Sequence, residues 1–274
     1  MTIVRKSERQ KGFTLIEIMV AMSVFLVICG AVFSLLDMSQ KRFRTESQVL
    51  DSFQQARLGL DEVVRDASDM GYPPQNQFTT APVAAPFAAI TPVAWSPNYA
   101  VAPCLIGTAG GGTCATPGDF DVIFEEQFDN TGVNWIRYTL QGTTLWRGAI
   151  LKTGNAPVDP AAVLSIAAGN MTPYVTNVMN NATAAQIAAF RATYPAMFPG
   201  GNPQPIFQYY CSDSTNGGIP VLCQNAPAAA DNSPANVRDV EVTLIVRSSR
   251  RDAQTGAPRL VELNGRGHRL NPNQ

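Results

Sequence analysis

The stretch that decides the fold is Phe13–Leu36, with the sequence FTLIEIMVAMSVFLVICGAVFSLL. It has 24 residues and a single charged one, Glu17, so the 19 residues from Ile18 to Leu36 carry no charge. At a helical rise of about 1.5 Å per residue, a helix of this length spans roughly 36 Å, enough to cross the apolar core of a bilayer. The sequence therefore predicts a membrane-spanning helix near the start of the chain.

The residues before this helix predict its orientation. Met1–Gly12 contains four basic residues against one acidic residue, Glu8. Because basic flanks stay in the cytoplasm, we expect everything after Leu36 to lie on the far side of the membrane. A cleaved secretory signal is disfavoured, since its apolar core is normally about 7–15 residues and ends in small residues. A plain anchor explains the length but leaves Glu17 without a role, although an ionisable group is costly in a membrane.

The helix is expected to continue beyond the membrane. No proline occurs between Phe13 and Met70, and Gly71-Tyr72-Pro73-Pro74 is a typical helix end. Apolar residues recur at steps of three and four, at Val49, Phe53, Ala56, Leu60, Val63 and Ala67. This stripe is shorter than three heptads, which favours packing against a globular domain over a coiled coil.

The rest of the chain reads as an antiparallel sheet, which gives an α+β fold. Strands are predicted at 120–124, 133–140, 144–147, 205–210 and 240–246. Gln141-Gly142-Thr143 predicts a hairpin turn between the second and third of these. Residues 73–118 and 150–204 are rich in Ala, Pro, Gly or Asn and are expected to form irregular surface segments, with a helix at Thr183–Tyr194.

Four of the five cysteines form two local pairs that predict disulfides in an oxidising compartment, Cys104–Cys114 and Cys211–Cys223. Four cysteines permit three pairings, so the connectivity stays open. Cys29 lies in the apolar segment and is expected to behave as a small buried hydrophobe. The spacing of the pairs and the single histidine disfavour zinc.

Other polar groups are expected to be solvated, and we predict neither an enzyme nor a cofactor or metal site. His268 is the only histidine and reads as part of a solvated tail, so no acyl-transfer triad can be built. The carboxylates of Asp119, Asp121 and Glu125-Glu126 suggest a solvated edge, with calcium as a minor alternative.

Arg247, Arg250 and Arg251 are expected to end a strand in solvent or to meet an acidic neighbouring subunit. Gly110-Gly111-Gly112 lacks the lysine of a phosphate-binding loop. The net charge of -1 argues against a nucleic-acid partner.

The stretch Lys11-Gly12-Phe13-Thr14-Leu15-Ile16-Glu17 resembles the prepilin motif of type IV pilins and type II secretion pseudopilins. The resemblance implies a pilin fold, in which a long N-terminal helix packs on an antiparallel sheet. It also implies that prepilin peptidase cuts between Gly12 and Phe13, and that Phe13 is then N-methylated. Residues 1–12 are then a cytoplasmic leader, 13–71 the helix with 13–36 in the membrane, and 72–274 a β-rich periplasmic or extracellular domain.

In this resemblance, Glu17 takes the position of the family's glutamate. Its carboxylate can pair with the ammonium of Phe13 on a neighbouring subunit, because two buried opposite charges cost less together than apart.

The strand order further resembles PilW-type minor pilins, which are related to the J-type minor pseudopilins. The matching elements are Asp121-Val122-Ile123, Arg137-Tyr138 through Leu145-Trp146-Arg147, Phe207–Tyr210 and Val237–Leu244 leading to Arg247-Ser248. This implies a minor pilin that helps to initiate assembly or sits near the filament tip. Its expected partners are other pilins and minor pilins, prepilin peptidase, the inner-membrane pilus assembly machinery and, before assembly, membrane lipid. The alternatives are a minor pseudopilin and a membrane-anchored periplasmic binding protein or enzyme, which would need neither Gly12-Phe13 nor Glu17.

Overall fold

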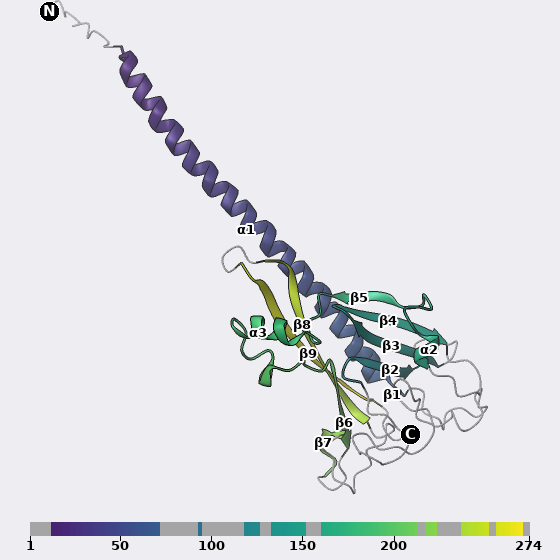
Figure 1. The fold of residues 1–274 in the computed structure, drawn as a ribbon. Helices are drawn as coiled ribbons and strands as arrows, with labels where there is room; N and C mark the ends of the chain where they lie inside the picture. Colours follow the sequence, from purple (N-terminus) through teal and green to yellow (C-terminus); the bar gives the residue numbers. More distant parts are fainter. Residues whose placement is uncertain are drawn as a thin grey trace, which may run out of the picture. The chain divides into compact units, whose positions relative to one another are not determined.

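The computed structural model describes residues 12–71, 93–94, 118–126, 133–151, 160–212, 217–223, 237–251 and 256–270. The chain divides into two compact units, Met1–Gln48 and Val49–Gln274. We call them the first and the second unit. The first is helical from Leu15 onward, and the second combines the C-terminal part of the same helix with the described strands (Figure 1).

The long helix α1 runs from Leu15 to Asp69, close to the bounds expected from the sequence. At its end Gly71 has a positive φ of 78°, a conformation that glycine adopts without strain. The Gly71 backbone N–H donates to the Glu125 carbonyl at 2.6 Å, which ties the end of the helix to a strand. In the second unit the predicted stripe is buried at Val49, Ala56, Leu60, Val63 and Ala67, while Phe53 is half-buried.

The strands are antiparallel, which confirms the α+β class, but the described strands form two sheets where the sequence predicted one. The five-stranded sheet has the order β1 (Val93–Ala94), β2 (Asp121–Glu126), β3 (Asn134–Gln141), β4 (Thr144–Leu151) and β5 (Thr172–Thr176). The four-stranded sheet has the order β7 (Pro220–Leu222), β6 (Phe207–Ser212), β8 (Val237–Arg251) and β9 (Pro258–His268).

The predicted hairpin is β3–β4, in which Gln141 pairs with Thr144 across a two-residue turn. Gly142 in this turn has a φ of 60°, as such tight turns require. The two sheets are connected where Val178 bridges to Val246 and the Met179 N–H donates to the Ile245 carbonyl at 2.7 Å. Both sheets and the C-terminal part of α1 share one hydrophobic cluster, so the helix is part of the core of the second unit.

Two glycines of β9 let this strand approach α1 closely. A Cβ placed on Gly265 would lie 2.6 Å from Val64 Cγ2, and one on Gly267 would lie 2.6 Å from Ala67 Cβ and 2.8 Å from the Val64 carbonyl oxygen. Real Cβ atoms do not come this near to other heavy atoms, so only glycine fits between strand and helix here. The two positions thereby set how close the sheet packs to α1.

The segment predicted as an irregular surface excursion at 150–204 is more integrated than expected. Its described part contains α2 (Pro160–Val163), β5, α3 (Ala184–Arg191) and a short 3₁₀ helix, η2 (Pro199–Gly201). Thr183 and Gln186 form a capping box that starts α3 inside the helix predicted from the sequence. Buried Met179, Ile187 and Phe198 pack on β8 and β9 through Ile245 and Leu260, so this segment covers part of the second sheet.

Candidate functional site

The N-terminal residues around the predicted cleavage site precede the helix. Gly12, Phe13 and Thr14 are not helical, and α1 begins one residue later at Leu15. The backbone N–H and the hydroxyl of Thr14 each donate to Glu17 Oε2 at 2.9 Å, and the Glu17 N–H donates back to Thr14 Oγ1 at 3.4 Å. This reciprocal arrangement is a capping box, which satisfies backbone donors at a helix start. Thr14 and Glu17 together therefore start the helix just after the bond expected to be cut.

The chain itself does not require glycine at position 12. A Cβ placed there would meet no heavy atom within 4 Å, and Phe13 beside it is 85% exposed. The Gly12–Phe13 bond is thus accessible in a non-helical segment, as a protease requires. A need for glycine would come from the enzyme that reads this segment rather than from the fold.

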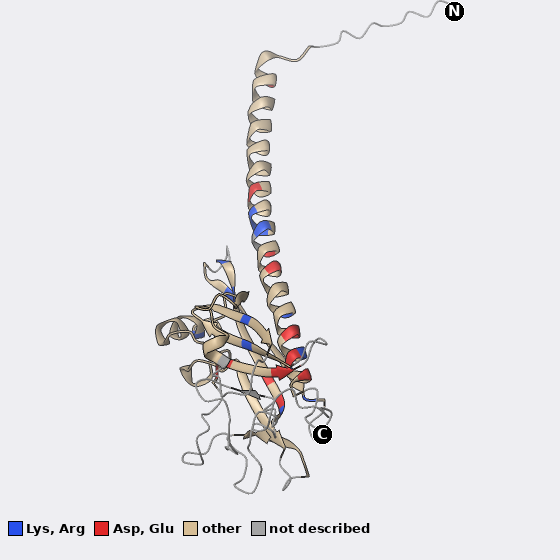
Figure 2. Cartoon of the chain, turned by 90° about the vertical axis from the view of Figure 1, so that its right-hand side faces the viewer, with Lys and Arg blue, Asp and Glu red and all other residues tan. Residues whose placement is uncertain are grey.

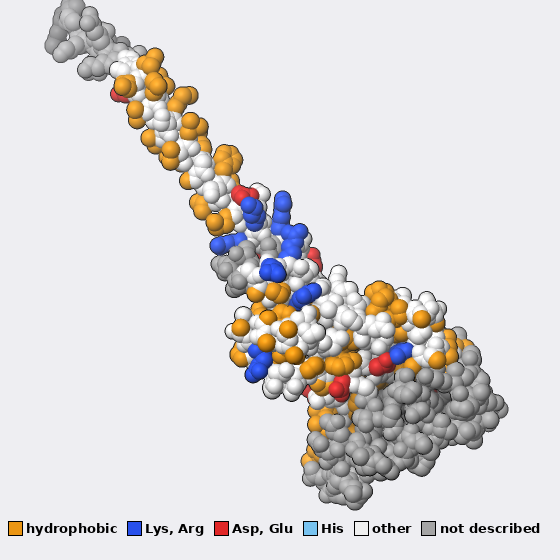
Figure 3. Space-filling model, viewed as in Figure 1, with side chains coloured by type: hydrophobic (Ala, Val, Ile, Leu, Met, Phe, Trp, Pro, Cys, Tyr) orange, Lys and Arg blue, Asp and Glu red, His pale blue; other side chains and the backbone are white. Residues whose placement is uncertain are grey.

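The N-terminal part of α1 presents apolar side chains on all sides. Its large hydrophobic residues from Leu15 to Leu36 are each 49% exposed or more, and Figure 3 shows them along the helix in orange. An exposed apolar surface of this extent marks contact with a membrane or with other proteins. Among the described residues α1 is the one helix long and apolar enough to cross a membrane, by length and composition. Glu17 is the charged residue that would have to enter that environment.

Residues 8–33 match the family model of the prokaryotic N-terminal methylation motif. The match includes the predicted cleavage site, Glu17 and the apolar part of α1. No curated protein and no solved structure matches the chain. Together, the motif and the apolar helix support a type IV pilin-like protein that is processed by prepilin peptidase and assembles with other pilins. For this pilin-like chain, α1 fits a single-pass anchor in the inner membrane.

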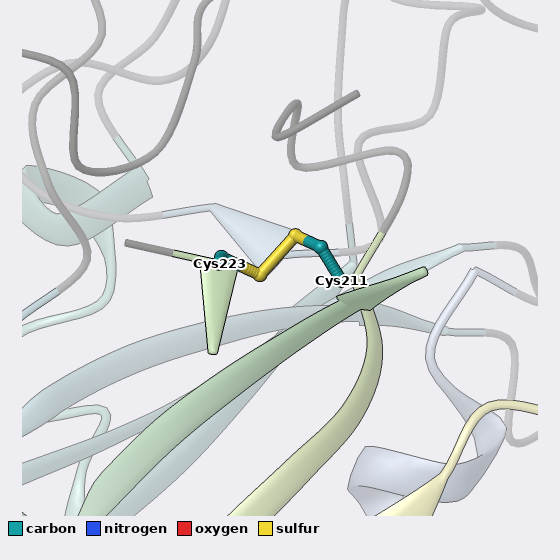
Figure 4. The surroundings of a disulfide bond; sticks show 2 residues. All are labelled: Cys211 and Cys223. Atoms are coloured by element: carbon teal, nitrogen blue, oxygen red, sulfur yellow. A yellow bond between two sulfur atoms is a disulfide. The ribbon is translucent and has the colours of Figure 1, made fainter. Parts of the chain in front are cut away.

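The second unit of the pilin-like chain contains the disulfide Cys211–Cys223 predicted from the sequence, which joins β6 to the end of β7 (Figure 4). Both residues are buried and belong to the core shared with α1. The predicted bond Cys104–Cys114 and the glycines 110–112 lie outside the described residues. Cys29 is a free thiol on α1 and is half-buried in this structure rather than fully buried, because the apolar side chains around it are exposed too.

A buried polar cluster joins α1 to β3 and β4 in the second unit. The Tyr138 hydroxyl donates to Asp66 Oδ2 at 2.6 Å, Arg147 Nη2 donates to the same oxygen at 2.9 Å, and Arg147 Nε donates to the Tyr138 oxygen at 2.8 Å. Burial, followed by the nearby charge of Asp66, raises the pKa of Tyr138 well above its usual value. Since each member of the cluster satisfies the others, we interpret it as the polar attachment of the helix to the first sheet.

Of the carboxylates predicted to form a solvated edge, Glu125 and Glu126 are in fact buried and Asp121 is half-buried, while Asp119 is exposed. Glu125 is 0% exposed and accepts a hydrogen bond from Trp135 Nε1 at 2.9 Å, and Asp121 forms an ion pair with Arg137. Glu126 is 2% exposed, and its Oε2 has no hydrogen-bond partner among the described residues. The sequence interpretation was wrong because β2 is covered on both faces, one by α1 and the other by Trp135 and its neighbours. Within the described part of the chain, no three His, Cys, Asp or Glu residues gather to hold a metal.

Burial, reinforced by the nearby charges of Asp66 and Asp69, raises the pKa of Glu126 from 4.5 to about 8, although Arg147 and Arg65 oppose the shift. Glu126 therefore binds more protons in the folded than in the unfolded state between these pH values, so its contribution to stability is largest at acidic pH and is lost as the pH rises. We expect the free energy of unfolding to fall by up to about 1.4 kcal/mol per pH unit between about 4.5 and 8.

A Glu126→Gln variant should lack this contribution and be more stable than the wild type at pH 9. Thermal unfolding of both chains from pH 5 to 9 measures the effect, with Glu241→Gln as a control at a partly exposed carboxylate on β8. Parallel pH profiles of wild type and Glu126→Gln would show that Glu126 does not stay protonated in the folded chain.

His268 is exposed, but it belongs to a strand rather than to a tail. It is on β9, opposite Asp239 of β8, and its Nδ1 contacts the Asp239 carboxylate. Arg266 Nη2 donates to the same carboxylate at 2.6 Å, and its guanidinium lies 4.3 Å from the centre of the Tyr210 ring. These residues cross-link neighbouring strands of the second sheet, and β9 was missed because Gly265 and Gly267 interrupt its apolar pattern.

Proposed function

We propose that this chain is a minor pilin of a type IV pilus, which helps to initiate filament assembly or sits near the filament tip. The observation that carries the proposal is the processing segment, in which Gly12-Phe13 is exposed and not helical and Glu17 lies in the first turn of an apolar helix. Such a helix serves first as an anchor in the inner membrane, with its N-terminus in the cytoplasm, and then as the filament contact. As a structural subunit the chain performs no catalysis.

The minor role is supported by the second unit. The sequence elements that resemble PilW-type minor pilins coincide with strands of the fold, at β2, β3–β4, β6 and β8. The length of 274 residues also exceeds that usual for a major pilin. Subunits of the filament shaft repeat many times. A larger second unit with added segments such as α3 suits a position in the filament that occurs once or a few times.

In the proposed mechanism, cleavage after Gly12 creates an ammonium group on Phe13 at the start of the apolar helix. When the helix leaves the membrane for the filament, this ammonium and the Glu17 carboxylate of an adjacent subunit become partners. A buried ion pair contributes position more than stability. It would therefore define the axial offset between subunits.

The test is the intact mass and N-terminal sequence of the chain recovered from envelopes and from sheared filaments. We expect the chain to start at N-methylated Phe13 in both fractions. In filaments we expect the chain to be present in a small amount relative to the main subunit. A start at Met1, or a cut beyond Leu36, would contradict the proposal. Deleting the chain should reduce surface filaments; a loss of protein secretion with filaments intact would instead indicate a minor pseudopilin.

A further inference from the structure

The β8–β9 hairpin carries a group of arginines at the end where β8 leads into β9. Between Arg247 and Arg259 the sequence has four arginines and one acidic residue, Asp252, which lies outside the described residues. Arg250 and Arg251 are exposed at the end of β8, and Arg259 is exposed at the start of β9. Figure 2 shows basic segments in blue at this end of the hairpin. The function proposed above does not use these residues.

The packing of β9 on α1 shows that the arginines lie at the end of the second unit where α1 enters it. Gly267 lies against Ala67, and Gly265 lies against Val64 and Leu60, so β9 followed backwards runs toward the start of α1. From Gly265 back to Pro258 the strand covers roughly 23 Å, which corresponds to about 15 helical residues. The arginines are therefore near the level of Val49, where the second unit begins.

The membrane is close to this point along the chain. Twelve residues lie between Leu36, the end of the apolar segment, and Val49, so the two are separated by roughly 20 Å of helix. The residues between them include Lys41, Arg42 and Arg44. The end of the second unit that the chain enters from the membrane is thus its arginine-bearing end.

We propose that four arginines at the end of the hairpin where β8 leads into β9 bind the anionic phospholipid headgroups of the membrane that anchors the chain. They are Arg247, Arg250, Arg251 and Arg259. The planar guanidinium forms paired hydrogen bonds with phosphate oxygens, which makes arginine well suited to this contact. Each basic residue near an anionic surface strengthens binding by about fivefold. The inference rests on the membrane-anchored state in the proposed function, and the contact ends when the subunit is extracted into a filament.

Hydrogen exchange of the full-length processed chain tests this contact. The chain is reconstituted into vesicles of phosphatidylcholine alone or mixed with phosphatidylglycerol, and exchange is followed in peptides covering 247–259. We expect exchange to be at least about tenfold slower in the anionic vesicles, with the difference lost at high salt because the charges are screened. Arg250→Gln should remove about fivefold of this protection. Arg65→Gln removes the same charge from the exposed face of α1 and should leave the protection unchanged.

Flotation of the vesicles distinguishes a chain that lacks the headgroup contact from a chain that is not anchored in the membrane. A chain that floats with both kinds of vesicle but exchanges equally in both is anchored without the contact, which would overturn this inference and leave the proposed function intact. A chain that floats with neither is not anchored, which would overturn both. Protection that appears only when another pilin subunit is added would identify an acidic protein surface as the partner and also overturn the inference.

Discussion

A chain with Glu17 replaced by alanine should still insert into the membrane and be cleaved after Gly12, yet be incorporated into filaments at less than about a hundredth of the normal level. The apolar segment is lengthened by the change, so insertion does not suffer. In the filament, however, the Phe13 ammonium of a neighbouring subunit would lose its partner. Removing one member of a buried ion pair costs about 3–5 kcal/mol, which is more than a hundredfold in an equilibrium.

Two further variants separate the charge of Glu17 from its contact with Thr14. Glu17→Gln keeps an oxygen that can accept the Thr14 hydrogen bonds but lacks the charge, and we expect it to be excluded from filaments as strongly as Glu17→Ala. Thr14→Val removes the hydroxyl from the capping box and keeps the carboxylate. We expect Thr14→Val to reduce the stability of the helix by about 1 kcal/mol, which is the usual contribution of an N-cap side chain. Quantifying each chain in sheared filaments by mass spectrometry measures the effect. Normal incorporation of Glu17→Ala, or equal losses in Thr14→Val and Glu17→Gln, would mean that the charge is not what matters.

Replacing Gly267 by valine is expected to destabilise the second unit by at least about 3 kcal/mol. The first added carbon would already lie 2.6 Å from Ala67 Cβ and 2.8 Å from the carbonyl oxygen of Val64. The carbonyl belongs to the helix backbone, so the clash cannot be relieved by a side-chain rotation. The helix would have to move away from β9 and with it from the core that both sheets share.

Thermal unfolding of the full chain in detergent measures this effect, which for a domain of this size corresponds to a fall of at least about 6 °C in Tm. Asn264→Val is the matched control, because it adds the same side chain to the exposed face of the same strand. We expect the control to stay within about 0.5 kcal/mol of the wild type. A Gly267→Val chain as stable as the control would show that α1 and β9 are not in close contact.

The sequence predicted those elements whose signals are local. α1 follows from an uninterrupted apolar run and a stripe at helical spacing, and β3–β4 follows from a glycine turn between two alternating segments. α3 lies within the helix predicted at 183–194, and its start is fixed locally, because Thr183 and Gln186 form a capping box within four residues. The processing segment was predicted for the same reason, since its residues are neighbours along the chain.

The elements that were missed depend on contacts between distant parts of the chain. β9 contains Gly265 and Gly267, which weaken its strand pattern. Glycine is needed at both positions because α1, about 200 residues earlier in the chain, packs too close for a Cβ. Glu125 and Glu126 read as solvated because alternation along a strand assigns faces without saying whether both are covered. Here both are covered, and the polar cluster of Asp66, Tyr138 and Arg147 likewise forms only when α1 packs on the sheet.

The burial of Cys211 and Cys223 puts an order on the maturation of the subunit. In the finished fold their exposures are 0% and 1%, so an oxidising enzyme cannot reach either sulfur. The bond must therefore form while β6 and β7 are still apart, after the segment has reached an oxidising compartment and before the core closes. A subunit that closes with both thiols reduced would be out of reach of later repair. We therefore expect oxidation of the two thiols to precede closure of the core.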